Sequence, residues 1–418
     1  MLLIAPIGAT RGLSNGIPGD CFQFIVICLI ARDGLQHHCR FLHLLSMQSC
    51  RETRSPQKTN CRALSIRFFL CPPPRRVGIN SMPVEFSTLS ADRKGKAPSE
   101  QMSMRQSFGL SLAVNTRAAG LSMGGQQRVT TEILQRLGPV ESIAPSRSLA
   151  GIKGHAWEQF VLPWRARGKF LWSPSATGPL AVRRQILTLH DVAFLDIPEF
   201  FAPKFVRFYS TLMPRLVRRV AKVVTVSEFS RKRIAATLGI EADQIEVISN
   251  GVCEQFHLYE PEDIAAVRAA LDLPQRYFVL QATSDRRKNL PKVLQAWNDL
   301  QGELPEDLWL VVAGNLAREH VFGSLGSLSA GPRTRILGFV DEQYFAPLIA
   351  AAEGFLFPSL YEGFGIPILE AMGCGTPVLT SAATATQEVA GDAALLVDPA
   401  SLRSIAEGIR ELATDADL

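Results

Sequence analysis

Two glutamates near the end of the chain have a spacing that could serve one chemical site. Glu362 and Glu370 lie eight positions apart in LYEGFGIPILEAMGCGTPVLTS, which runs from Leu360 to Ser381. The apolar stretch GFLFPS before them predicts a strand, and Pro367 is typical of the first turn of a helix. Glu362 is therefore expected in a loop, and Glu370 about one turn into a short helix.

The loop between these acids also carries a candidate anion site. Gly363 and Gly365 flank Phe364, and backbone without side chains lets a ligand approach closely. A helix N-terminus beside them favours an anion by about 0.3–1 kcal/mol. A capping acid and an ordinary turn would explain Glu370 alone, but not Glu362 together with the glycines. The pattern predicts that the two carboxylates bind sugar and ribose hydroxyls.

Cations follow an earlier strand of the same half. Arg287 and Lys288 lie in SDRRKNL, directly after the apolar YFVLQAT. At a strand's carboxyl end they could hold a diphosphate, each charge-assisted bond contributing about 1.5–3 kcal/mol. Consecutive cations are also typical of a solvated surface. The glycine turn in the same half favours the phosphate interpretation.

Two further candidates lie in the first half. His190 ends the apolar LTLH and should point toward a cleft, where it can donate to a sugar hydroxyl or a phosphate. The alternative is a structural histidine. Gly124 and Gly125 begin the first predicted helix, where backbone could approach an acceptor or a diphosphate, or could form only a tight turn.

Strand and helix patterns alternate along most of the chain and predict an α/β fold. Short apolar strands followed by amphipathic helices indicate parallel sheets with helices on both faces. We expect two doubly wound, Rossmann-like domains facing a cleft, since such sheets bind ligands beyond the carboxyl ends of their strands. The predicted segments are an N-terminal domain at 105–258, a linker at 259–275 and a C-terminal domain at 276–418.

Residues 1–104 differ from the rest in charge and pattern. They hold 13 Lys and Arg against 6 Asp and Glu, whereas the whole chain of 418 residues has a net charge of +5, so the body is nearly neutral. This distribution argues against nucleic-acid binding. Six of the eight cysteines also lie here, without paired CxxC spacing. The segment is expected to be an irregular, disordered extension, or to follow a start assigned upstream of Met102 or Met104.

Several other classes of protein lack support in the sequence. The chain has no GxxxxGK[ST] loop, GxSxG elbow or HExxH pair, and no evident carboxylate cluster for a divalent cation. Its longest early apolar run, FQFIVICLIA, has ten residues, whereas a membrane-crossing helix needs about 20. The sequence indicates a cytoplasmic protein, and peripheral attachment through a basic or amphipathic helix is compatible with it.

Several segments of the sequence resemble those of the glycosyltransferases of group 1, family 4, which have the GT-B fold. The resemblance covers residues 108–400 and is carried by GGQQR, GHAWEQ, LPWRARG, TLHDVAFLDIPEFF, VTVSEFSRKRI, VISNGV, RRKNL, LGFV and the E-x7-E stretch that contains Glu362 and Glu370. It implies retaining, metal-independent transfer of a hexose such as mannose from a nucleotide-diphosphate sugar. The acceptor would be a glycan or a lipid-linked molecule in surface polysaccharide or lipopolysaccharide synthesis, and no cofactor would be needed.

The resemblance also implies a role for each candidate residue. His190 and Glu362 would act at the transferred sugar, and Glu370 would bind the ribose hydroxyls. Contacts to the donor phosphates would come from the cations, glycines and loop amides, namely Gly125, Arg287, Lys288, Gly363, Phe364 and Gly365. The nucleotide sugar would be a co-substrate, with the leaving diphosphate helping to deprotonate the acceptor.

The sequence departs from the family pattern in two places. Ala282 stands where similar sequences have glycine, and an arginine often found early in the following loop is missing, which implies a looser grip on the donor. The chain also ends at Leu418, whereas related chains continue through helices that close the cleft. The alternatives are therefore a truncated protein that binds a nucleotide sugar with little or no catalysis, and a nucleotide-sugar epimerase on the same fold.

Overall fold

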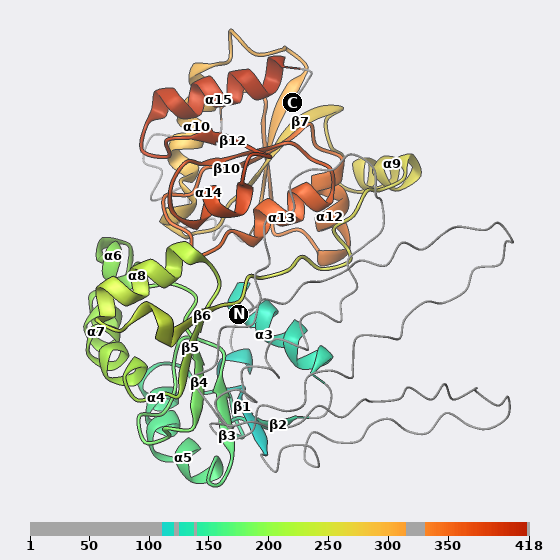
Figure 1. Ribbon diagram of the computed structural model, residues 1–418. Helices are drawn as coiled ribbons and strands as arrows, with labels where there is room; N and C mark the ends of the chain where they lie inside the picture. The colour runs from blue at the N-terminus through green and yellow to red at the C-terminus, as the bar shows by residue number, and fades with distance from the viewer. Residues whose placement is uncertain (1–110, 121–124, 138–139, 315–330, 416–418) are drawn as a thin grey trace, which may run out of the picture.

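The computed structural model of the protein describes residues 111–120, 125–137, 140–314 and 331–415 (Figure 1). The predictions about residues 1–104 lie outside the described residues. Within these limits, the chain forms two bodies, each built on a parallel sheet, and Figure 1 shows one body above the other. The predicted α/β fold is confirmed.

The first sheet has the strand order β2-β1-β3-β4-β5-β6, and every described pair in it is parallel. Its strands are β1 (Leu112–Asn115), β2 (Glu141–Ile143), β3 (Phe170–Ser173), β4 (Gln185–Thr188), β5 (Lys222–Thr225) and β6 (Ile245–Val247). The helices around it are α3 (Gly125–Arg136), α4 (Gly151–Phe160), α5 (Leu162–Arg165), α6 (Ala193–Asp196), α7 (Pro203–Val217) and α8 (Glu228–Leu238), with short 3-10 turns η1 (Ala118–Gly120), η2 (Pro198–Phe200) and η3 (Ala242–Gln244).

The second sheet has the order β12-β11-β10-β7-β8-β9 and is also parallel throughout the described residues. Its strands are β7 (Arg276–Gln281), β8 (Leu308–Ala313), β9 (Thr334–Gly338), β10 (Gly354–Phe357), β11 (Val378–Ser381) and β12 (Leu395–Val397). The accompanying helices are α9 (Pro261–Ala270), η4 (Arg286–Lys288), α10 (Leu290–Asp299), α12 (Glu342–Ala350), α13 (Ile366–Gly373), α14 (Thr384–Ala390) and α15 (Leu402–Thr414).

The order of the second sheet reverses between β7 and β10, which are direct neighbours. In open α/β sheets, ligands bind beyond the carboxyl ends of the strands at such a reversal. The loop after β7 carries Lys288, and the loop after β10 carries Glu362. The topology therefore brings together two motifs that are 74 residues apart in the chain.

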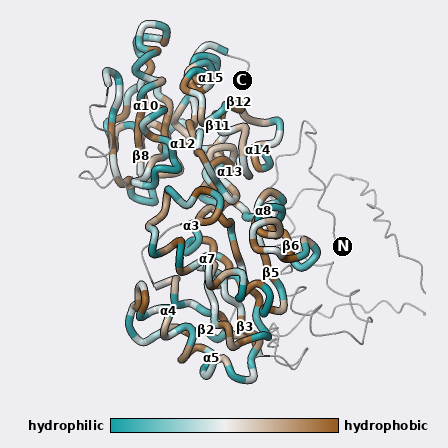
Figure 2. The backbone as a smooth tube through the Cα atoms, turned by 90° about the vertical axis from the view of Figure 1, so that its left-hand side faces the viewer, coloured by the Kyte–Doolittle hydropathy of each residue, from teal (hydrophilic) through white to brown (hydrophobic). Residues whose placement is uncertain are grey.

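Each sheet is buried between helices, as expected for strands that are apolar along their whole length. In Figure 2 the hydrophobic stretches run through the sheets, whereas hydrophilic stretches lie mainly on the outer helices. In the second body, α10 and α15 cover one face with Trp297 and Ile409 fully buried, and α12 and α13 cover the other with Ile349 and Ile368. These packed cores fix the strand ends at which the candidate residues lie.

Local sequence signals set several helix boundaries. The N-cap of α8, Ser227, accepts a hydrogen bond from the amide of Ser230, and Gly239 ends the helix with φ of 63°. Helix α9 lies within the residues predicted as a linker, and its Val267 is buried in the same core as Tyr277 of β7. The predicted domain limits at 258 and 276 stay a prediction.

Candidate functional site

Lys288 and Glu362 form an ion pair at the reversal point of the second sheet. The Nζ of Lys288 lies 2.8 Å from Oε1 of Glu362, and the two side chains are 18% and 17% exposed. The ammonium group also lies 4.3 Å from the centre of the Phe357 ring. Asn289 holds the neighbouring loops in place by donating to the carbonyls of Pro358 and Pro399. Two residues predicted to share a site are thus in direct contact.

Arg287 lies next to this pair, but its guanidinium is already bound. Its Nε lies 3.0 Å from Oδ2 of Asp285, and its Nη2 lies 2.5 Å from the same oxygen. The guanidinium carbon also lies 5.2 Å from the centre of the Phe201 ring, which belongs to the first body. Burial raises the pKa of Asp285, but the hydrogen bonds from Arg287 outweigh it and lower that pKa. A diphosphate would have to compete with Asp285 for Arg287.

The loop that contains the predicted anion site is fixed by groups from both bodies. Gly365 adopts φ of 102°, a conformation that favours glycine, immediately before α13 begins. The carbonyl of Gly363 accepts hydrogen bonds from the hydroxyls of Ser227, at 2.7 Å, and Ser230, at 3.0 Å. Because the N–H and C=O of one peptide point in opposite directions, these bonds turn the amide of Phe364 away from α8.

Glu370 is the most perturbed of the predicted acids. Its residue is 4% exposed, and burial raises its pKa to about 7. The guanidinium of Arg128 opposes this effect, with its Nη1 3.3 Å from Oε1 of Glu370, and its Nη2 lies 3.3 Å from the exposed Glu342. Sequence reasoning missed Arg128. The available signal was a cation three residues after Gly125 on a helix that begins at the cleft.

Glu370→Gln is expected to remove a pH-dependent loss of stability. A carboxyl whose folded pKa exceeds its ordinary value of 4.5 destabilises the fold as pH rises from about 4.5 to 7. The variant should therefore gain up to about 3 kcal/mol of unfolding free energy relative to the wild type across this window. Urea unfolding at pH 5 and pH 7.5 measures the change, with Glu342→Gln as the exposed control. An equal difference in unfolding free energy between wild type and Glu370→Gln at both pH values would contradict the assignment.

His190 and Asp191 follow β4 and lie against the loop of the second body. A Cβ atom added to Gly363 would lie 2.8 Å from the backbone oxygen of His190 and 2.8 Å from Cβ of Asp191. Burial raises the pKa of Asp191, while Arg287 opposes this rise and Glu362 adds to it. Asp191 thus belongs to the same charged cluster. Asp191 was not among the site residues predicted from the sequence.

The imidazole of His190 is turned toward its own body. It is 7% exposed, and Nε2 lies 3.2 Å from the carbonyl oxygen of Pro174. Burial lowers its pKa to about 4, so the ring is neutral near pH 7. Since a carbonyl only accepts, Nε2 carries the proton and Nδ1 does not. In this arrangement Nδ1 would accept a hydrogen bond from a ligand hydroxyl, whereas a donor was predicted from the sequence.

Gly125 stands at the first described residue of α3, three residues before Arg128. The position that a Cβ atom would take there has no neighbour within 4 Å. The structure therefore leaves room beside Gly125, but it joins this residue to the cleft acids only through Arg128 on the same helix. Gly124 lies outside the described residues.

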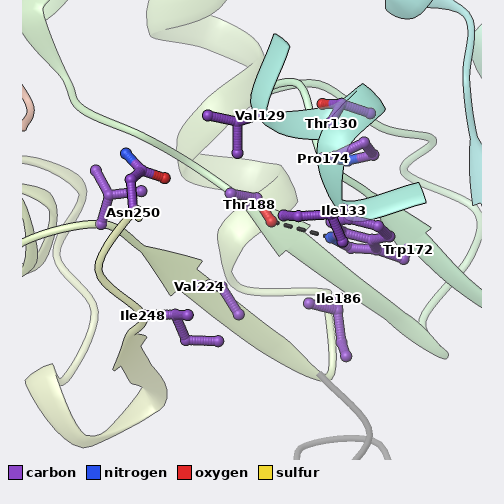
Figure 3. A pocket seen from close by; sticks show the side chains of 11 residues that line it. Val129, Thr130, Ile133, Trp172, Pro174, Ile186, Thr188, Val224, Ile248 and Asn250 are labelled. Atoms are coloured by element: carbon purple, nitrogen blue, oxygen red, sulfur yellow. Dashed lines mark hydrogen bonds between the residues drawn. The ribbon is translucent and has the colours of Figure 1, made fainter. Parts of the chain in front are cut away.

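A small apolar pocket lies between α3 and the first sheet (Figure 3). Val129 and Ile133 of α3 face Trp172 and Ile186 of the sheet across it. The indole nitrogen of Trp172 donates to the hydroxyl of Thr188 at 3.0 Å. The side chains that line this pocket include none that titrates, so it offers no group for acid–base chemistry.

The two bodies are joined beside the cleft by hydrogen-bonded side chains. The hydroxyl of Tyr361 donates to Oδ2 of Asp196 at 2.8 Å, and Arg233 binds the same carboxylate with two nitrogens. On α14, the Glu388 carboxylate accepts the amides of Glu228 and Phe229 at the start of α8, at 2.8 and 2.9 Å. These contacts hold the loop after β10 against the first body.

The described part of the chain contains neither a metal-ligand cluster nor a helix suited to span a membrane. No group of three or more metal-ligating His, Cys, Asp or Glu side chains occurs among these residues. Among the same residues, no helix combines the length and apolarity that a membrane span requires.

Comparison with known families matches most of the two bodies. The family described as Glycosyltransferase Family 4 matches residues 168–256, and the one described as Glycosyl transferases group 1 matches residues 263–418. Together these ranges span more than half of the chain. They contain His190 in the first body, and Lys288 and both acids of the E-x7-E stretch in the second.

Curated relatives carry names from the same area of chemistry. O-antigen chain mannosyltransferase B of Escherichia coli is 33% identical over 242 residues, which are 57% of this chain and 63% of that protein. O-antigen chain mannosyltransferase RfbU of Salmonella typhimurium is 26% identical over 247 residues, which are 58% of this chain and 65% of that protein. This chain thus spans less than two thirds of the length of these relatives.

Solved structures confirm the fold. HepE of Anabaena, solved in complex with UDP and glucose, has a TM-score of 0.57 at 19% identity. The match covers 73% of this chain and 90% of HepE. WaaG, a glycosyltransferase involved in lipopolysaccharide biosynthesis, has a TM-score of 0.58 at 17% identity, covering 73% of this chain and 91% of WaaG. The two facing parallel sheets, the spaced motifs and the matched families show that this chain belongs to the group 1, family 4 glycosyltransferases with the GT-B fold.

Proposed function

We propose that the protein is a retaining glycosyltransferase that moves a hexose, with mannose as the leading candidate, from a nucleotide-diphosphate sugar to a glycan or lipid-linked acceptor. The observation that carries this proposal is the Lys288–Glu362 pair at the reversal of the second sheet, beside the start of α13. The relatives named as O-antigen mannosyltransferases support the sugar and the surface-polysaccharide setting.

The donor diphosphate is assigned to the positive side of this cluster. Lys288 supplies one positive charge, and the amides of Phe364 and Gly365 supply dipoles next to the N-terminus of α13. When the bond between the sugar carbon and the diphosphate breaks, negative charge grows on the leaving oxygen. A cation and fixed amides stabilise that charge more than the ground state, and this difference lowers the barrier.

The remaining roles follow the order of groups along the cleft. Glu362, in contact with Lys288, binds hydroxyls of the transferred sugar, and Glu370 binds the ribose after the donor displaces Arg128. Nδ1 of His190 accepts a hydrogen bond from a sugar hydroxyl. The acceptor oxygen attacks the same face of the sugar that the diphosphate leaves, and its proton passes to the leaving phosphate oxygen. No metal or cofactor is required in this scheme.

We place this reaction on the cytoplasmic side of the membrane, with the protein attached peripherally. A donor that carries a diphosphate is polar, and a lipid-linked acceptor keeps its tail in the bilayer. A peripheral enzyme meets both substrates at this boundary.

A panel of nucleotide sugars tests the function. The full chain, incubated with GDP-mannose, UDP-glucose and related donors plus a glycan acceptor, should release nucleoside diphosphate in step with a product sugar attached to the acceptor. Free or epimerised sugar would favour the epimerase alternative. Calorimetric donor binding without release would favour a binding protein that catalyses little.

Ser230→Ala tests whether α8 positions the Phe364 amide, which is assigned to the donor diphosphate. This variant loses one of the two hydroxyl bonds to the Gly363 carbonyl but keeps the Ser227 cap of α8. Loss of one such bond should weaken donor binding by about threefold to tenfold. Calorimetric titration with the donor measures it, and Ser210→Ala, an exposed serine on α7, is the matched control. Equal donor affinity in Ser230→Ala and wild type would remove this positioning role.

A further inference from the structure

An exposed apolar stripe runs along α4 and continues onto α5. Ile152 and Phe160 are 88% and 81% exposed, and Trp164 on α5 is 73% exposed. Ile152, Ala156 and Phe160 are spaced four residues apart, so they lie on one side of the helix. Large apolar side chains gathered in this way on a surface mark a site of interaction.

The opposite side of the same helices is firmly packed, so the stripe cannot turn inward. Glu158 and Leu162 are fully buried. A Cβ atom added to Gly154 would lie 2.4 Å from the carbonyl oxygen of Leu149. The Glu158 carboxylate is bound by Asn115 and Thr177 at 2.6 Å each. The orientation of α4, and with it the outward direction of the stripe, is therefore fixed.

Helix α7 extends this surface. The ring of His155 on α4 lies 4.5 Å from that of Phe208 and 5.6 Å from that of Tyr209, centre to centre. Phe205 and Phe208 are 41% and 39% exposed. Figures 1 and 2 both place α4 beside α7, with α5 at the end of the first body that lies farthest from the second body.

Exposed cations outnumber exposed acids around these apolar side chains. Between residues 144 and 169 the one acid is Glu158, which is buried, and α7 contains no acid. We call the combined surface the basic aromatic face. It consists of exposed apolar side chains flanked by exposed cations, namely Ile152, Phe160, Trp164, Phe205 and Phe208 with Lys153, Arg165, Arg167, Lys204 and Arg207.

We propose that the basic aromatic face docks the protein on an anionic lipid surface. Basic residues around Trp and Phe suit the boundary between charged headgroups and acyl chains. A second copy of the chain is disfavoured, because symmetric pairing would bring like charges together. Residues 1–104 are disfavoured as a cover for the same reason, since they hold 13 Lys and Arg against 6 Asp and Glu. The inference deepens the peripheral attachment proposed above.

Docking through this face also sets where the candidate site lies relative to the lipid. The basic aromatic face extends from α5, at the end of the first body farthest from the second body (Figure 1), to Phe205, whose ring lies 5.7 Å from that of Phe201. The Phe201 ring in turn contacts Arg287 of the second body. A protein bound through this face therefore holds the Arg287 side of the candidate site near the lipid surface, where a lipid-linked acceptor would lie.

Vesicle sedimentation tests the proposal. The full chain is mixed with vesicles of phosphatidylcholine alone, or of phosphatidylcholine with phosphatidylglycerol. We expect binding to the anionic vesicles, weakened by salt. Ile152→Ser/Phe160→Ser and Lys153→Glu/Arg207→Glu should each weaken it by at least about tenfold. Phe339→Ser, which changes a 74% exposed aromatic of the second body, and Arg403→Glu on α15 are the matched controls.

Three results would overturn the proposal. The first is equal binding to neutral and anionic vesicles, and the second is variants of the face that bind as well as their controls. The third is a concentration-dependent dimer in sedimentation velocity that the same variants dissolve, because the face would then join two copies. Turnover with a water-soluble acceptor should stay unchanged in these variants, so failure of docking and failure of the proposed reaction are separate outcomes.

Discussion

Lys288→Met is expected to lower kcat/KM for donor turnover by about 10² to 10³. Removal of one group that stabilises a developing anion typically costs this much, equivalent to about 2.7–4 kcal/mol. The Nζ of Lys288 is held at 2.8 Å from Glu362 and over the Phe357 ring, so it is positioned before the donor arrives. Steady-state release of nucleoside diphosphate measures the loss.

The ion pair itself requires a control, because Lys288→Met leaves the Glu362 carboxylate partly buried without its partner. This should reduce the unfolding free energy by about 1–3 kcal/mol. The double variant Lys288→Met/Glu362→Gln removes both charges, so it should recover stability but not turnover. If both recover, the pair is structural and the assigned site is wrong. Lys292→Met, which removes an exposed amine bound to the Ala400 carbonyl, is the matched control and should remain within about twofold of wild type.

Gly363→Ala is expected to reduce turnover by at least about 100-fold while the chain still folds. The new methyl group would lie 2.8 Å from both the His190 oxygen and Asp191 Cβ, closer than real Cβ contacts allow. The loop after β4 must therefore move away from the loop after β10. Overpacking of this kind costs about 1–3 kcal/mol. A 1 Å displacement of catalytic groups can reduce the rate by about 10²-fold.

The reason for this sensitivity is that Gly363 lies between the two bodies. Its carbonyl accepts from Ser227 and Ser230, and the neighbouring Tyr361 binds Asp196. A shift at the glycine would break these bonds and leave the Phe364 amide without a fixed direction. Gly302→Ala is the matched control, because its added methyl group would meet nothing within 4 Å. Turnover in Gly363→Ala within twofold of wild type would show that the contact between the bodies is dispensable.

Much of the fold could be predicted because it follows from local pattern. Apolar strands that alternate with amphipathic helices have few solutions other than parallel sheets covered on both faces. The N-cap at Ser227, the Gly239 stop and the strand-to-helix turn at Pro367 are short-range signals that need no tertiary contact. The contact between Lys288 and Glu362 was also within reach, because parallel strands place their carboxyl ends at one edge.

The side-chain directions could not be predicted, because they depend on partners far away in the chain. Arg287 was expected to be available to a diphosphate, yet it is bound by Asp285 and stacked on Phe201 of the other body. His190 was expected to donate into the cleft, yet its Nε2 is used by Pro174. A sequence shows that a charge or a ring is present, whereas its surroundings decide which neighbours it binds.

The E-x7-E stretch contains both features that follow from local sequence and features that depend on tertiary contacts. The turn, the short helix and the placement of one acid in each follow from local sequence, because Gly365 and Pro367 restrict the backbone. The electrostatics of the two acids depend on tertiary contacts. The tertiary structure places Lys288 against Glu362, and it buries Glu370 beside Arg128 from the first body, which raises the pKa of Glu370 to about 7. Burial and charge pairing arise between segments that meet only when both bodies are folded, and for this reason they leave no local signal in the chain.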